Sequence, residues 1–216
     1  MLPKLPTFRS SLLRLHHAII KIDQSLSWVD RTPRLNKLEK FVILLEDKRF
    51  LQHFGFDMKS AFREIWRFLK RERNGGASTI EMQLFRTTSD RYERTIRRKL
   101  REIVATIVMH RKFTKIEILR AYLQIAYMGT GLKGVNAAAR ECFPHHFTDN
   151  DEIYFGFEIV DFNDFSDEEC AFLASMLVYP KPRVPTVNWN SKIARRSNYG
   201  LALYSRRHKS LDQILR

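Results

Sequence analysis

Two adjacent carboxylates at the end of an apolar run are the first residues of this sequence whose types and spacing could do chemistry. Residues 41–45 are apolar, and Glu46 and Asp47 follow directly, before the basic pair Lys48 and Arg49. The apolar spacing predicts a helix that is buried on one face. Two acids at a buried helix end are costly unless they are paired or used. The stretch therefore predicts a carboxylate site, and a solvated acid pair beside Lys48 and Arg49 is the alternative.

A second acid, Glu102, lies in the most cationic stretch of the chain, which begins at Arg86. Spacings of three and four residues place Arg94, Arg98 and Arg101 on one helix face. We expect the opposite, apolar stripe to be buried and to hold these arginines rigidly toward a partner, whereas a solvated helix is the alternative. The stripe that we expect to be buried consists of Leu100, Ile103, Val104, Ile107 and Val108.

Two glycine-rich segments punctuate the sequence. Residues 74–76 predict a sharp break, and Ser78 with Glu81 has the spacing of a capping box, which predicts a helix start. The same loop could instead present backbone N–H groups to a phosphate. Residues 129–134 have the glycine spacing of a dinucleotide-binding fingerprint, but no strand is expected before them. We therefore reject a dinucleotide site.

Charge and composition narrow the class of protein. The net charge of +14 and the pI of about 10.0 predict an anionic partner, which is a nucleic acid, an anionic lipid or a phosphorylated substrate. Residues 141–180 contain many acids but no Lys or Arg, so they form an acidic stretch in a basic chain. Few glycines and prolines indicate a largely helical protein. Cys142 and Cys170 suggest neither a disulfide framework nor a zinc site.

Two helices are expected in the first third of the chain. Ser10 or Ser11 is expected to cap a helix that reaches about Val29, and this helix either covers the domain or lies in a membrane interface. A second helix is expected after Asp57. Its aromatic residues and cationic end suit either a core helix or one that enters an anionic bilayer. No run approaches the roughly 18 apolar residues of a membrane-spanning helix.

Later elements are marked by caps and alternation. Thr114 and Ser166 each have a glutamate three residues later, so each is expected to cap a helix. The alternation over residues 153–160 predicts a small hairpin. A last basic helix, at about 189–208, either packs back on the domain or lies on a membrane.

Five segments of the sequence follow one another in a distinctive order. They are Glu46-Asp47-x-x-Phe50-x-x-His53-x-Gly55, Gly76-Ala77-Ser78-Thr79-Ile80 with Gln83, Arg98-Lys99-x-x-Glu102, Lys115-x-x-Ile118-Leu119-x-x-Tyr122-Leu123, and Gly129-x-Gly131-x-x-Gly134-Val135-x-Ala137-Ala138. This order resembles the peptidoglycan glycosyltransferase family, which comprises monofunctional transglycosylases and the transglycosylase module of class A penicillin-binding proteins. The resemblance covers roughly residues 38–185.

The resemblance implies a mostly α-helical, lysozyme-like fold with a large head lobe and a smaller, membrane-associating jaw lobe. We expect the glycosyltransferase domain at 35–185, and the residues outside the resemblance predict an N-terminal arm and helix at 1–34 and a C-terminal basic helix at 186–216. Within the domain, the jaw is expected at about 57–75 and the acidic insert at about 149–165.

The resemblance also implies an activity, namely polymerisation of lipid II into β-1,4-linked peptidoglycan glycan strands, with inversion and release of polyprenyl pyrophosphate. The implied partners are lipid II or a related polyprenyl-pyrophosphate glycan, an anionic membrane surface and other cell-wall synthesis proteins. The implied location is peripheral, on the periplasmic face of the inner membrane. A nucleic-acid partner is not expected, because only the charge supports one.

Individual site residues are carried over from the matching motifs. Glu46 matches the family's catalytic base, which removes the proton of the acceptor hydroxyl. Glu102 matches the second essential glutamate, which lies near the donor pyrophosphate and its divalent metal, so the expected cofactor is Mg²⁺ or Mn²⁺ with Glu102 as a ligand. The residues expected to bind substrate are Asp47, Arg49, His53, Ser78, Thr79, Gln83, Arg86, Arg94 and Lys99.

The sequence departs from the family at a few positions. Glu81 and Met82 stand where the family usually has Thr-Gln, and Arg120 and Gln124 stand where it usually has Glu and Asn. Glu81 either changes the substrate preference from beside the cleft or serves only as the cap partner of its helix. The alternatives are therefore a transferase acting on a different polyprenyl-linked saccharide, and an inactive scaffold that binds a lipid-linked precursor.

Overall fold

The computed structural model describes residues 7–26, 34–55, 78–89, 96–147, 153–154, 157–158 and 160–214. The expected jaw, the helix after Asp57 and the glycine break at 74–76 lie outside these residues. The elements in order are α1 (Phe8–Leu26), α2 (Lys37–Glu46), η1 (Phe50–Gln52), α4 (Ile80–Ser89), α5 (Ile96–His110), α6 (Lys115–Ile125), β1 (Tyr127–Gly129), β2 (Leu132–Lys133), α7 (Val135–Cys142), η2 (Pro144–His146), β3 (Ile153–Tyr154), β4 (Phe157–Glu158), α8 (Asp167–Met176) and α9 (Val187–Ile214). The prediction of a mostly α-helical protein is confirmed.

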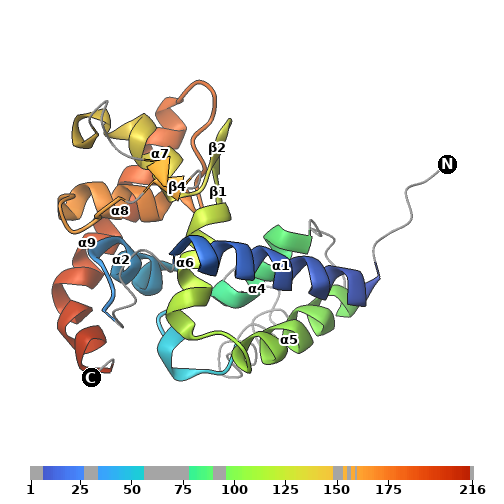
Figure 1. Cartoon of the computed structure of the whole chain (residues 1–216). Helices are drawn as coiled ribbons and strands as arrows, with labels where there is room; N and C mark the ends of the chain where they lie inside the picture. The colour runs from blue at the N-terminus through green and yellow to red at the C-terminus, as the bar shows by residue number, and fades with distance from the viewer. Residues whose placement is uncertain are drawn as a thin grey trace.

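The helices pack in two groups on either side of α6 (Figure 1). In one group, α8 packs against α9 and α2, and α2 also contacts α9. In the other, α4 contacts α1, α5 and α6. The last helix therefore packs back on the domain, which was one of its two expected positions. The first helix covers the domain, since α1 contacts α4 and α6 and Leu15 is buried.

Local signals explain most helix boundaries. Thr114 and Ser166 cap α6 and α8 through complete capping boxes, as predicted. Asn36 caps α2 in the same way, with Glu39 as its partner. The cap of α1 is Thr7 rather than Ser10 or Ser11, because Thr7 Oγ1 accepts a hydrogen bond from the Ser10 N–H.

Two short antiparallel hairpins complete the described fold. β1 pairs with β2 in the glycine segment, and β3 pairs with β4 in the acidic insert, where a hairpin was predicted. Gly129, on β1, lies so close to Lys181 that a side chain there would meet its backbone oxygen at 2.4 Å. β1 begins two residues before the first glycine, where no strand was expected, but it forms an antiparallel hairpin with β2 and not the parallel βαβ unit of a dinucleotide site.

The prediction for α5 was wrong about which face is buried. Leu100, Val104, Ile107 and Val108 are 46–59% exposed. The buried face instead carries Glu102, Ala105, Thr106 and Met109. Two contacts explain the reversal. Glu102 pairs with Arg86 of α4, and a side chain at Gly55 would meet Thr106 Cβ at 2.7 Å, so small residues are needed on this face.

Candidate active site

Glu46 is the last residue of α2, and the burial of that helix fixes where its carboxylate lies. Phe41, Val42 and Ile43 are fully buried, so the helix cannot rotate without exposing them. The Glu46 side chain is 8% exposed. Arg196 Nη2 lies 2.5 Å from Glu46 Oε1 and also donates to the Leu45 carbonyl at 3.1 Å. The carboxylate is thus held by a guanidinium that is itself anchored to the end of α2.

Arg196 reaches Glu46 because α9 approaches α2 closely. A side chain at Gly200 would meet Leu45 Cδ1 at 3.1 Å, so this helix crossing requires a small residue. Ile193 and Ser197 are buried on the same face of α9, three residues before and one residue after Arg196. Arg196 was not among the predicted site residues. An arginine among the apolar and small residues of a helix face is the signal that could have revealed it.

The other oxygen of Glu46 faces a neutral pair of side chains. Gln83 Nε2 donates to Glu46 Oε2 at 3.3 Å, and Tyr122 OH donates to Gln83 Oε1 at 2.5 Å. Burial and the negative charge of Glu46 raise the pKa of Tyr122, so its hydroxyl remains a donor. The tyrosine therefore holds the amide with its N–H toward Glu46. Gln83 was a predicted site residue. Tyr122 belongs to the fourth motif but was not predicted to act in the site.

Glu102 is fully buried against a second set of cations. Arg86 Nε donates to Glu102 Oε1 at 3.1 Å, and Arg86 Nη2 donates to Ser78 Oγ at 3.1 Å. Lys99 Nζ lies 4.0 Å from Glu102 Oε2 and 3.3 Å from Met82 Sδ. Four predicted site residues, Ser78, Arg86, Lys99 and Glu102, are thus brought together where α4 meets α5.

The expected divalent metal finds no complete donor set at Glu102 in the described part of the chain. Its carboxylate faces the Arg86 guanidinium and the Lys99 ammonium, and Glu102 is in neither cluster of three potential metal ligands among the described residues. Mg²⁺ and Mn²⁺ prefer several oxygen ligands. The described donors alone therefore do not form a site for this metal. Its ligation by Glu102 stays a prediction.

The remaining residues of the first motif lie in a buried pair. Asp47 Oδ2 and His53 Nε2 are 2.9 Å apart, and both residues are less than 9% exposed. Thr79 is also buried, where its Oγ1 donates to the Gly55 carbonyl and accepts from the Met82 N–H. These contacts favour a positioning role for all three residues. Their direct contact with substrate stays a prediction.

Glu81, the departure from the family pattern, is turned into the protein. Its Oε1 lies 2.5 Å from Lys115 Nζ and 3.1 Å from His110 Nε2, and the residue is 0% exposed. Burial alone would raise its pKa, but the hydrogen bond from His110 and the charge of Lys115 outweigh burial and lower the pKa of Glu81 to about 2. The expectation of a carboxylate beside the cleft is therefore wrong. The cap of α4 is Thr79, one residue after Ser78.

The two other arginines that were predicted to bind substrate are Arg49 and Arg94. Arg49 is half-buried in the turn between α2 and η1. Arg94 lies outside the described residues. Lys115 and His110, which were not among the predicted site residues, connect α6 and α5 to α4 through Glu81.

The chain is similar to known proteins over most of its length. The transglycosylase family model matches residues 16–204, which is most of the chain. The chain belongs to the transglycosylase family. It is 35% identical over 156 residues to a biosynthetic peptidoglycan transglycosylase of Nitrosomonas eutropha, an alignment that covers 71% of this chain and 57% of the relative.

Two further relatives show how transglycosylase sequences occur in longer proteins. A biosynthetic peptidoglycan transglycosylase of Haemophilus influenzae is 32% identical over 172 residues, which cover 79% of this chain and 63% of the relative. Penicillin-binding protein 1F of Bacillus subtilis is 31% identical over 196 residues, which cover 85% of this chain and 25% of the relative. This transglycosylase-family chain thus spans from a quarter to less than two thirds of the length of these relatives.

Proposed function

We propose that this chain is a peptidoglycan glycosyltransferase that polymerises lipid II, with Glu46 as the general base. The observation that carries the proposal is the setting of the Glu46 carboxylate, which one cation and one oriented amide hold at the end of a rigid helix. A sugar hydroxyl becomes an effective nucleophile when a positioned base takes its proton in the transition state. Glu46 is fixed in this way, and the family relationship supports the reaction class.

The step transfers one proton, breaks the bond between the sugar and the pyrophosphate, and forms one glycosidic bond. The 4-hydroxyl of a lipid II GlcNAc loses its proton to Glu46, while its oxygen attacks the anomeric carbon of the growing chain. The bond from that carbon to polyprenyl pyrophosphate breaks, and the bonding pair leaves with the pyrophosphate. The attack inverts the anomeric centre and gives a β-1,4 linkage.

The leaving pyrophosphate gains negative charge, and fixed cations stabilise such charge. Arg86 and Lys99 supply two cations whose positions are set by Glu102, Ser78 and Met82. Glu102 acts in this account by holding these cations. Arg49 and Arg94 are proposed as additional phosphate contacts because they match the family's motifs.

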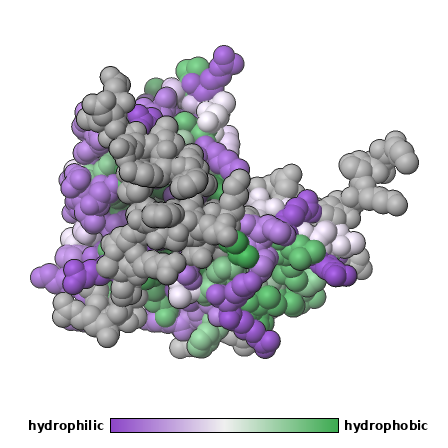
Figure 2. All heavy atoms as spheres, viewed as in Figure 1, coloured by the Kyte–Doolittle hydropathy of each residue, from purple (hydrophilic) through white to green (hydrophobic). Residues whose placement is uncertain are grey.

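We further propose that the apolar face of α5 lies against an anionic membrane. Figure 2 shows hydrophobic residues gathered over α5, and the exposed residues are Leu100, Val104, Ile107 and Val108. A lipid surface would bury this face, and the net charge of +14 would be attracted to anionic head groups. No described helix is long and apolar enough to cross a bilayer. The proposed attachment is peripheral, on the periplasmic face of the inner membrane.

The activity is tested with labelled lipid II. We expect wild-type protein to produce glycan chains that a muramidase digests, together with released polyprenyl pyrophosphate. A chelator added to a parallel reaction tests the predicted need for Mg²⁺ or Mn²⁺. Absence of product, under conditions where a relative makes chains, would contradict the lipid II proposal. Product from only a different polyprenyl-linked saccharide would assign that donor instead.

Membrane attachment is tested by co-sedimentation with anionic liposomes. Val104→Asp should reduce binding severalfold, because it places a charge on the apolar face of α5. Val184→Asp is the matched control, since Val184 is 72% exposed on the segment between α8 and α9. Equal binding by the two variants would contradict the α5 surface. Trp66→Asp and Phe68→Asp test the predicted contribution of the jaw.

A further inference from the structure

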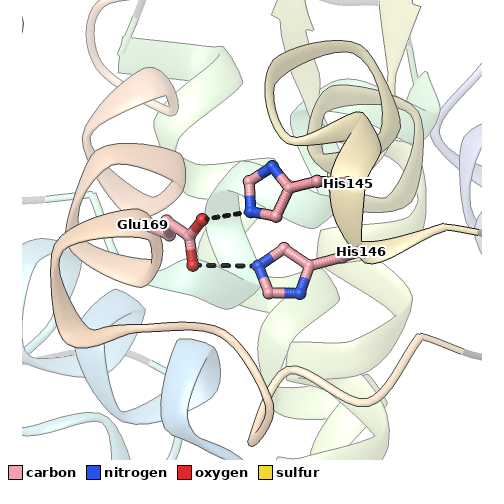
Figure 3. A group of neighbouring side chains, drawn as sticks. All are labelled: His145, His146 and Glu169. Atoms are coloured by element: carbon pink, nitrogen blue, oxygen red, sulfur yellow. Dashed lines mark hydrogen bonds and ion pairs between the residues drawn. The ribbon is translucent and has the colours of Figure 1, made fainter.

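Two adjacent histidines and one glutamate converge outside the candidate active site. His145 Nε2 lies 3.1 Å from Glu169 Oε1, and His146 Nε2 lies 3.0 Å from Glu169 Oε2 (Figure 3). The histidines come from η2 and the glutamate from the first turn of α8. One ligand atom from each of the three side chains lies within 4.8 Å of the others. Three potential ligands from two elements therefore face one small volume.

We propose that His145, His146 and Glu169 bind a divalent transition-metal ion, with Zn²⁺ as the best match. Two imidazole nitrogens and a carboxylate form a known zinc ligand set, with ligands about 2.0–2.2 Å from the ion. Tetrahedral geometry with such bonds separates neighbouring ligand atoms by about 3.4 Å. Each imidazole nitrogen now lies 3.0 or 3.1 Å from a different oxygen of Glu169, and one ligand atom from each of the three side chains lies within 4.8 Å of the others, so a small rearrangement would place the three around one ion. Mg²⁺ and Ca²⁺ prefer oxygen ligands, so they fit this set poorly.

The ligands are already oriented by their surroundings. Glu169 Oε2 accepts the Ser166 N–H at 2.8 Å as part of the α8 capping box. The His146 ring stacks on the buried Phe165 ring, with 3.9 Å between centroids. Partners of this kind fix ligand geometry and strengthen metal binding. The His145 side chain is 65% exposed, so water can supply the fourth ligand.

The site is separate from the carboxylates assigned to catalysis. Glu46 ends α2 and Glu102 lies on α5, whereas η2 and the first turn of α8 supply the proposed ligands. A bound ion would connect the two ends of the chain segment from residue 146 to residue 169, which includes the acidic insert. We therefore expect a bound ion to hold η2 against the first turn of α8. Among the described residues there is one other cluster of three potential ligands, formed by Asp47, His53 and Glu81. The Lys115 ammonium lies 2.5 Å from Glu81 Oε1 in that cluster, which belongs to the site already described.

The proposal is tested by metal titration of the full chain without a polyhistidine tag. We expect calorimetry to show one Zn²⁺ per chain, an increase in thermal stability on binding, and no comparable response to Mg²⁺. His145→Ala and His146→Ala should each weaken Zn²⁺ binding by at least about 10-fold, the scale on which even outer-shell partners act. Glu169→Gln should weaken it similarly while keeping an oxygen for the Ser166 N–H.

His208→Ala is the matched control, because it removes an imidazole that bonds the Tyr204 carbonyl on α9. It should retain wild-type Zn²⁺ binding. Circular dichroism without metal identifies any variant that fails to fold. The Co²⁺ spectrum of the wild-type protein gives a second measurement, in which intense tetrahedral bands are expected. No Zn²⁺ binding by wild type, or unchanged binding in the His145 and His146 variants, would overturn the proposal. Neither result depends on glycosyltransferase activity.

Discussion

Glu46 and Glu81 are two largely buried carboxylates with different surroundings. Glu46 meets one guanidinium and one neutral amide, and both of its oxygens have a partner. Glu81 lies inside the protein, where a lysine and a histidine contact the same oxygen. Among the described residues, its other oxygen has no hydrogen-bond partner. Burial beside cations is therefore common to both carboxylates, and it does not by itself distinguish the proposed base, Glu46, from Glu81.

We expect Glu81 to contribute mainly to stability and Glu46 mainly to turnover. Glu81 balances the charges that join α4, α5 and α6, so its removal should act mainly on stability. Glu46 lies at a helix end that Arg196 and Gln83 hold in place, so its removal should act mainly on turnover. Variants at these positions and at their neighbours can strengthen or break this distinction.

The largest effect is expected for Glu46→Gln. The change keeps the shape and an oxygen for Arg196 but removes the proton acceptor, so turnover of lipid II should fall by about 10²–10⁴-fold. The matched control is Glu39→Gln, which changes the buried glutamate that pairs with Arg120 at the other end of α2. Glu39→Gln should retain turnover at temperatures where it is folded. A similar loss in both variants would indicate a structural role for Glu46.

The next effect is expected for Glu81→Gln. Breaking a buried ion pair on one side typically costs about 3–5 kcal/mol, so we expect the free energy of unfolding to fall by about 3 kcal/mol. Chemical denaturation monitored by circular dichroism measures this loss. A change below about 1 kcal/mol would mean that Lys115 and His110 do not depend on this carboxylate.

The contribution of Glu81 to stability should also depend on pH. The folded-state pKa of Glu81 is about 2, against an ordinary value of 4.5, so its contribution to stability is complete above about 4.5. The contribution is lost as the pH falls from 4.5 through about 2. The stability difference between wild type and Glu81→Gln should therefore shrink over this range. A constant difference in denaturation midpoints would contradict the lowered pKa.

A smaller effect is expected for Tyr122→Phe. This change removes the donor to Gln83 Oε1 and leaves the amide free to turn away from Glu46, at a cost of about 1 kcal/mol in stability. Turnover should fall by up to about 10-fold, because Gln83 only positions the base. Kinetic assays beside Glu46→Gln would rank the two residues. A loss as large as that of Glu46→Gln would make Tyr122 part of the chemistry.

Local sequence signals predicted much of the fold. The capping boxes at Thr114 and Ser166 specify their helices from within four residues, because each side chain satisfies a nearby backbone group. The motif order also selected Glu102, Arg86, Lys99 and Ser78, which the structure brings together.

Long-range contacts explain what the sequence could not supply. Arg196 lies 150 residues from Glu46, and their contact depends on the close crossing of α9 over α2 at Gly200. The buried face of α5 was predicted wrongly because hydrophobicity alone cannot show that Glu102 pairs with a cation on the neighbouring helix. Nor can it show that the backbone at Gly55 lies close to Thr106. The sequence likewise could not show that Glu81, expected beside the cleft or as a cap partner, would meet Lys115 and His110 inside the protein.

The different roles of the two carboxylates are separated most directly by a paired assay of turnover and thermal stability on the same preparations of Glu46→Gln and Glu81→Gln. We expect opposite results for the two variants. Glu46→Gln should keep a melting temperature near that of wild type and lose turnover, whereas Glu81→Gln should lose stability and retain turnover below its melting temperature. Near-normal turnover in a folded Glu46→Gln protein would contradict the assignment of Glu46 as the base.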